Sequence, residues 1–360
     1  MPGSFRSLLS ALLLSAALAR ACAAQGFSIA GPDSSRLTLN GRVHALFNTT
    51  SEEDAPQAEM VLRRVRLEAT MRINDLVTGR IQPEFAGSRV SLRDAYVRLT
   101  IDPAFNIWAG QAHRPFSAIT QLSSNRMVPA ERGLRIRGVS GAYDEYALVS
   151  ELGYSERDLG VQVRGEFKDA PLGLSYAAGW FNGPARTDFP RENTGQVVAR
   201  IGAAPAAKVR MNVSWSARDF AVRDSAAGDA RVRRGDAWEA DVELGTDAGG
   251  PHLLVEAVTG DFDPFSGARF GGAQGWLSYR TSRFSRRLSA IEPLVRVSYG
   301  DPDTGNDMAD RAGPHGGTLI TPGVNLWLGG LNRVAINYDI WSPREGDRAQ
   351  SFKMLFQVAF

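Results

Sequence analysis

The sequence predicts an all-β protein, a transmembrane antiparallel β-barrel of about sixteen strands. Near the end of the chain, apolar residues occupy alternate positions up to a final aromatic residue, Phe360. Such a segment is typical of the strand that closes a bacterial outer-membrane barrel. Strand-like runs recur along the whole chain, separated alternately by long polar loops and tight turns. After residue 25, no apolar run reaches the roughly 20 residues that a membrane-spanning helix needs.

Alternation of apolar and polar residues marks each expected strand. Fourteen or eighteen strands remain open, because strand counting from one sequence errs easily. An even number, with long extracellular loops and short periplasmic turns, places both termini on the periplasmic side of the outer membrane of a Gram-negative bacterium. The expected strands are Leu37–Phe47, Val61–Ile73, Val77–Phe85, Val90–Ile101, Phe105–Ala112, Leu159–Phe167, Leu172–Phe181, Gln196–Gly202, Val209–Ala217, Trp238–Thr246, His252–Thr259, Phe270–Ser282, Ile291–Tyr299, Thr318–Leu328, Arg333–Trp341 and Phe352–Phe360.

Residues 1–24 read as a secretory signal peptide, which leaves 25–360 as the barrel domain. Arg6 precedes an apolar run of about a dozen residues, and small residues follow at the expected cleavage site. Cys22, the only cysteine, lies inside this segment, so the mature chain is expected to lack disulfides. Lipid attachment at Cys22 is the alternative, but Arg20 fits a lipoprotein cleavage site poorly.

The period of two divides each strand into an apolar face and a charged face. In the second expected strand, Val65, Leu67 and Met71 share one face, whereas Arg64 and Arg66 share the other. In a barrel the arginines point into the lumen, because arginine facing lipid near the midplane costs about 2–4 kcal/mol. Several aromatic residues suit interfacial girdles, although each could equally be a core residue: Trp108, Trp180, Phe181, Tyr299 and Trp341.

Several segments carry a family resemblance. They include Leu62–Glu68 (LRRVRLE), Ser91–Val97 (SLRDAYV), Ala109–Ser117 (AGQAHRPFS) and Glu131–Gly133 (ERG). Together they resemble the phosphate-selective porin O and P family of Gram-negative outer membranes. The resemblance covers nearly the whole mature chain and is most specific in its amino-terminal third.

The resemblance implies a sixteen-stranded, usually trimeric, anion-selective channel whose third loop folds into the lumen as a constriction. The candidate for this loop is 113–157. The best-known members also rely on lysines, but this chain has only Lys168, Lys208 and Lys353, so phosphate specificity is a separate question from anion preference. The expected pore-lining and anion-binding residues are Arg42, Arg64, Arg66, Arg72, Arg80, Arg98, Arg114, Arg126, Arg132, Arg135 and Arg137, balanced by Glu68, Glu84 and Asp94.

The expected function is therefore a passive, water-filled channel for small anions, phosphate or related oxyanions among them. Expected partners are these anions, outer-membrane lipid and lipopolysaccharide, and two further copies of the chain, but not nucleic acid. No cofactor, metal site or enzyme activity is expected, because the four histidines lack metal-ligand spacing and no nucleophile motif is present. The alternatives are a non-conducting structural or adhesive barrel and a barrel hydrolase.

Overall fold

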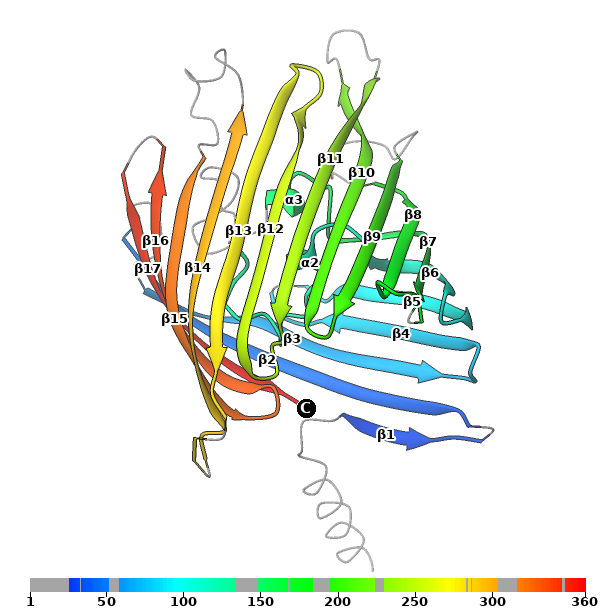
Figure 1. Cartoon of the computed structure of the whole chain (residues 1–360), viewed down its shortest axis with the longest axis horizontal. Helices are drawn as coiled ribbons and strands as arrows, with labels where there is room; N and C mark the ends of the chain where they lie inside the picture. Colours follow the sequence, from blue (N-terminus) through cyan, green and yellow to red (C-terminus); the bar gives the residue numbers. More distant parts are fainter. Residues whose placement is uncertain are drawn as a thin grey trace, which may run out of the picture.

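The computed structural model places sixteen strands, β2 to β17, in a closed antiparallel barrel with a seventeenth short strand, β1, beside it (Figure 1). The structure describes residues 26–32, 34–51, 58–87, 89–133, 148–167, 169–183, 195–223, 230–282, 284–285, 287–303, 316–344 and 347–360. The expected signal peptide therefore lies outside the described residues.

Each barrel strand pairs with its neighbours in the chain, and the pairing of β17 with β2 closes the ring. The strands are β1 (Phe27–Ala30), β2 (Arg36–Thr50), β3 (Ala58–Arg72), β4 (Val77–Glu84), β5 (Ser91–Asp102), β6 (Phe105–His113), β7 (Arg157–Phe167), β8 (Leu174–Phe181), β9 (Gln196–Ala206), β10 (Val209–Arg223), β11 (Ala230–Gly245), β12 (Gly250–Asp263), β13 (Ala268–Arg280), β14 (Ala290–Asp303), β15 (Gly317–Gly329), β16 (Asn332–Pro343) and β17 (Ala349–Ala359). Two short helices, α2 (Ala118–Gln121) and α3 (Leu148–Glu151), lie between β6 and β7. None of the helices in the described part of the chain is long and apolar enough to cross a membrane.

The prediction of sixteen strands is confirmed, and every expected strand overlaps an observed one. Two details were wrong. β1 was not expected, and the expected strands Val209–Ala217 and Trp238–Thr246 are too short, because β10 extends to Arg223 and β11 begins at Ala230. Polar and charged residues dominate the stretch between these two expected strands, so its sequence lacks the apolar alternation that identifies a strand.

The barrel closes where Phe360 meets β2. The Gly41 amide donates to the Phe360 carbonyl oxygen at 2.9 Å, and the Phe360 amide donates to the Gly41 carbonyl oxygen at 3.1 Å. A β-carbon at Gly41 would lie 2.1 Å from Cζ of the Phe360 ring, so only glycine lets the ring pack there without a shift. β1 pairs with the part of β2 that continues beyond this point, through Phe27 and Leu39.

The predicted division of faces holds for the first expected strands. Leu67 is 51% exposed on the outer surface, whereas Arg64 and Arg66 are buried inside. The predicted aromatic girdle is only partly right. Trp180 and Tyr299 are exposed outside, but Phe181 and Trp341 are buried within the barrel and Trp108 lines the lumen.

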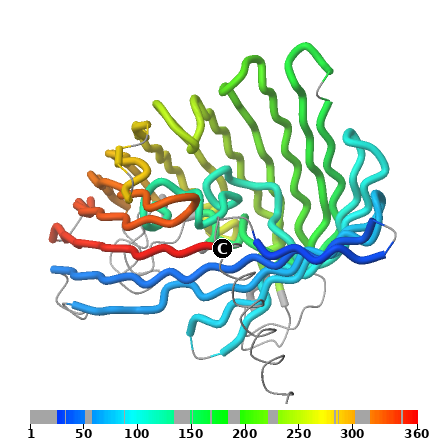
Figure 2. The backbone as a smooth tube through the Cα atoms, turned by 90° about the horizontal axis from the view of Figure 1, so that it is seen from below, coloured from blue at the N-terminus to red at the C-terminus, as the bar shows by residue number. Residues whose placement is uncertain are grey.

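The long connection between β6 and β7, residues 114–156 and named L3 below, enters the barrel where it is described. Figure 2 shows this segment within the ring of strands. Phe116 and Tyr154 pack against Phe181 of β8 and Phe270 of β13 in one buried apolar cluster. Ile119 and Val128 pack against Leu254, Trp276 and Leu294 of β12 to β14 in a second cluster. L3 and the wall formed by β8 to β14 therefore share an apolar core inside the barrel.

Candidate functional site

A cavity of about 540 Å³ lies between L3 and the opposite wall, β2 to β7. L3 contributes residues from Gln121 to Ser124, together with Glu131, Arg132, Ser150 and Glu156. Among the described residues, nine arginines and three acidic residues line this cavity. The arginines are Arg42, Arg63, Arg64, Arg66, Arg80, Arg93, Arg132, Arg157 and Arg164, and the acids are Asp94, Glu131 and Glu156.

Two β-bulges add arginines to this wall. His44 pairs with Arg64 and Ala45 with Leu62, so Arg63 is an extra residue in β3. A bulge re-aims side chains that strict alternation would send outward. Arg63 and Arg64 accordingly both reach the Glu131 carboxylate inside the barrel, at 2.7 Å and 3.1 Å.

The second bulge lies in β5. Gln82 pairs with Asp94 and Pro83 with Leu92, which leaves Arg93 as the extra residue. Proline has no amide hydrogen to donate to the ladder, so it is confined to edges and bulges within sheets. Arg93 and Asp94, although adjacent in sequence, both line the cavity.

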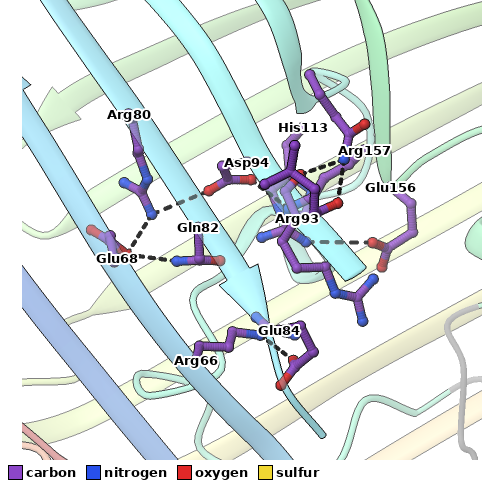
Figure 3. Close-up of polar contacts among 12 residues, drawn as sticks. Arg66, Glu68, Arg80, Gln82, Glu84, Arg93, Asp94, His113, Glu156 and Arg157 are labelled. Carbon is purple, nitrogen blue, oxygen red and sulfur yellow. Dashed lines mark hydrogen bonds and ion pairs between the residues drawn. The ribbon is translucent and has the colours of Figure 1, made fainter. Parts of the chain in front are cut away.

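The acids in the wall are shared between arginines (Figure 3). Glu68 lies 2.7 Å from Arg80 and 3.5 Å from Arg42. Asp94 lies 3.2 Å from Arg80 and also pairs with Arg157. Because each of these acids neutralises only part of two guanidinium groups, the network fixes the arginine side chains and leaves a positive excess facing the cavity.

L3 is held by side chains from most of the way around the barrel. The Ser117 hydroxyl donates to Glu256 of β12 at 2.7 Å, and the Ala118 amide donates to Glu239 of β11 at 3.2 Å. Farther along, the Ala130 amide donates to Asn337 of β16 at 2.7 Å. The loop thus spans the lumen, with its anchors on the far wall and its polar edge toward the arginines.

Of the predicted pore-lining residues, Arg42, Arg64, Arg66, Arg80 and Arg132 come together around the main cavity. Arg98 lines a second cavity described below. The predicted balancing acids Glu68, Glu84 and Asp94 pair with arginines of the same wall: Arg42 and Arg80, Arg66, and Arg80 and Arg157, respectively.

Three predicted residues lie elsewhere. The Arg72 side chain is 55% exposed beside Asp75 in the turn after β3. The Arg114 side chain is 3% exposed and binds Gln196 and the Ser155 carbonyl oxygen, so it anchors L3. Arg126 is 61% exposed and 3.7 Å from Asp247. None of these three is among the residues that line the cavities in the described part of the chain. Arg135 and Arg137 lie outside the described residues.

The sequence prediction missed Arg63, Arg93, Arg157 and Arg164 in the main cavity. Arg164 follows the alternation of β7, opposite Leu159 and Val161, and could have been found from that pattern. Arg63 and Arg93 lie at bulges, where strict alternation predicts that the side chain faces outward although it lies inside the barrel. Pro83 within an expected strand was the available signal for the second bulge.

The open space continues toward the end of the barrel that carries the short turns. A second cavity, about 500 Å³, shares Trp108, Gln121 and Arg164 with the first. A third, about 540 Å³, shares Glu166, Ser175 and Asn212 with the second and reaches Lys208 in the turn between β9 and β10. The three cavities follow one another from L3 to the turns.

The ionisable groups that L3 brings to the cavity stay charged near neutral pH. Burial lowers the pKa of Arg132 to about 10, so its guanidinium remains protonated. Burial acts to raise the pKa of Glu131, but the charges of Arg63 and Arg64 outweigh it and hold that pKa well below the usual range. The pKa of Glu156 is lowered in the same way, by Arg132 and Arg157 against burial.

We expect ion preference to be independent of pH between about 5 and 8, because none of these loop groups changes charge in that window. Reversal potentials in a potassium chloride gradient at pH 5, 6, 7 and 8 check this. Preference that rises steeply as the pH falls below 7 would show that a histidine, rather than these loop charges, sets the field.

Within the described residues, no group of three or more His, Cys, Asp or Glu side chains could hold a metal ion. The fold and the lined cavity define a class of protein, the outer-membrane porins. Residues 37–213, just under half of the chain, match the family described as phosphate-selective porin O and P. The family and the fold describe a channel and not an enzyme. No curated protein sequence matches significantly.

Solved structures share the fold at low sequence identity. OmpF of Salmonella typhi, in complex with daunomycin, is 14% identical with a TM-score of 0.62, covering 92% of this chain and 100% of that one. The anion-selective porin from Comamonas acidovorans is 13% identical with a TM-score of 0.58, covering 91% and 100%. The trimer form of Vibrio cholerae OmpT is 11% identical with a TM-score of 0.58, also covering 91% and 100%.

Proposed function

We propose that the protein is a passive outer-membrane porin that prefers small anions, with phosphate and related oxyanions as the favoured class. The observation that carries the proposal is the excess of arginines over acids around the main cavity. A narrow space lined by one sign of charge concentrates ions of the opposite sign. Each guanidinium also presents a planar fork that matches the oxygens of phosphate or a carboxylate.

The arginines are arranged for passage rather than for retention. They extend from the main cavity through Arg98 and Arg200 of the second cavity to Lys208 and Arg210 of the third. Conduction requires sites that attract an ion but also release it. Several moderate sites, some of them tempered by a nearby acid, meet this requirement better than one tight site.

The arrangement in the membrane follows from the same proposal. The end of the barrel with the long connections faces the outside of the cell. The end with the short turns faces the periplasm, together with the beginning of β1 and Phe360. L3 supplies the constriction. The protein acts as a homotrimer, in line with the trimer form of its structural neighbour OmpT. Outer-membrane lipid contacts the outer apolar face.

L3 offers a matched pair of variants that test the proposal. Arg132 lines the main cavity, whereas Arg126 belongs to the same loop but is not among the residues that line it and lies 3.7 Å from Asp247. Arg132→Gln should lower the chloride-to-potassium permeability ratio about sevenfold, because one charge at about 7 Å in a watery pore changes the energies of the two ions by about 0.6 kcal/mol each, in opposite directions. Arg126→Gln should change it little. Single-channel reversal potentials in a potassium chloride gradient measure both.

Equal effects of the two variants would contradict the assignment of the cavity as the ion path. Correctly folded protein that conducts no current would favour a structural or adhesive role instead. Competition by millimolar phosphate against chloride current decides the finer question of oxyanion preference. Without such competition, the protein would be a general anion channel.

A further inference from the structure

An aromatic pair stands in the lumen where the first and second cavities meet. The rings of Tyr96 and Trp108 are stacked, with centroids 4.6 Å apart and an angle of 20° between their planes. Tyr96 lines the first cavity, and Trp108 lines both. The residue opposite Tyr96 in the ladder is Gly110, whose missing side chain leaves room for the ring. With φ of +122° and the Ala95 carbonyl oxygen 2.4 Å from any added β-carbon, only glycine fits there.

Two guanidinium groups lie close to the Trp108 ring. Cζ of Arg164 is 4.8 Å and Cζ of Arg98 is 5.8 Å from its centroid. Arg98 reaches the Thr78 hydroxyl at 3.5 Å, and Arg164 donates to Gln162 and to the His113 carbonyl oxygen. Neither pairs with a carboxylate within the described part of the chain. Two guanidinium groups without a carboxylate partner among the described residues thus lie where the wall is aromatic.

A channel that conducts only inorganic anions along a row of arginines does not need this aromatic surface. Chloride and phosphate have no apolar face to place against an indole or phenol ring. A solute that carries both a carboxylate and a flat ring can use both features at once. Its carboxylate accepts hydrogen bonds from a guanidinium, and its ring packs against the aromatic pair.

We propose that the Tyr96–Trp108 pair, with Arg98 and Arg164, forms a subsite for planar aromatic carboxylates on the path through the barrel. This inference rests on the proposed anion channel and names a class of organic solute for it. Gln121 of L3 lines both cavities at the same level, so solutes that pass L3 meet the subsite directly.

Benzoate and cyclohexanecarboxylate form the decisive pair of probes, because they share charge and approximate size but only benzoate is flat and aromatic. Each is added to a single-channel recording in potassium chloride, and its block of chloride current is titrated. Ring-to-ring packing predicts that benzoate blocks with an affinity about two- to tenfold higher. Trp108→Leu should abolish this difference, and Trp108→Phe should keep most of it.

Trp180 supplies the control, because it is exposed on the outer surface of β8, two strands along the barrel from the β6 strand that carries Trp108. Trp180→Leu should leave the preference for benzoate intact. Equal block of the wild type by the two carboxylates overturns the inference even if Trp108→Leu does not fold. The same recordings report reversal potential, so absence of anion preference would reject the proposed channel, whereas anion preference without benzoate selectivity rejects the subsite alone.

Discussion

Replacing Glu131 by alanine is expected to detach the middle of L3 from β3. The Glu131 side chain is 1% exposed and accepts from Arg63 and Arg64. Removing one partner from a buried ion network leaves the other charges unpaired, which costs about 3–5 kcal/mol. We expect the folded barrel to denature at a lower temperature. We also expect a larger, noisier single-channel conductance as L3 moves.

Asp75→Ala is the matched control. Asp75 also pairs with an arginine, but its side chain is 91% exposed, and such surface pairs contribute only about 0–1 kcal/mol. Heating monitored by gel mobility of the folded form compares the two variants. Identical stability and conductance for Glu131→Ala and Asp75→Ala would refute the anchoring role of Glu131.

The pH dependence of stability provides a second test of the ion pairs that Glu131 forms with Arg63 and Arg64. Its pKa is depressed in the folded protein, so its contribution is present above the ordinary pKa of a glutamate. The contribution is lost as the pH falls through the lower, folded-state value. The wild type should therefore lose more of its stability than Glu131→Ala when the pH is lowered below about 4.

Replacing Phe116 by alanine is expected to loosen the beginning of L3. Phe116 is fully buried, and its ring centroid lies 6.3 Å from that of Tyr154 in the cluster with Phe181 and Phe270. A buried Phe→Ala change costs about 3–5 kcal/mol, because it removes apolar contact and leaves a cavity. The loop should then sample positions away from β8 to β13.

Hydrogen exchange of the amides in 116–133 and single-channel conductance measure this effect. Exchange should speed up, and conductance should rise above that of the wild type. Phe105→Ala, which removes a ring that is 40% exposed, is the control and should change neither. Unchanged protection of 116–133 in Phe116→Ala would show that the apolar cluster does not hold the loop.

The sequence was enough to predict the barrel, because alternation in strands with one apolar face is a strong and repeated signal. The same signal placed Arg42, Arg64 and Arg66 inside correctly. It failed where the backbone departs from regular pairing. The bulges that turn Arg63 and Arg93 toward the cavity depend on register between strands, which a single strand does not reveal.

The inward-facing apolar residues escaped prediction for another reason. In a water-filled barrel, Phe181, Trp276 and Trp341 should face lipid or the interface. They are buried inside, Phe181 and Trp276 in the clusters that hold L3 and Trp341 in a cluster of its own with Leu319 and Ala349. A loop has no period, so the path of L3, and the roles of Arg114 and Arg126 that follow from it, could not be read from sequence.

The central claim is that the arginine-lined space between L3 and the β2–β7 wall makes the channel prefer anions. The most direct test is the reversal potential of the wild-type channel across a bilayer with a tenfold potassium chloride gradient at neutral pH. The account predicts a potential with the sign of chloride selectivity. A potential with the sign of potassium selectivity would contradict it, even though the barrel itself would stand.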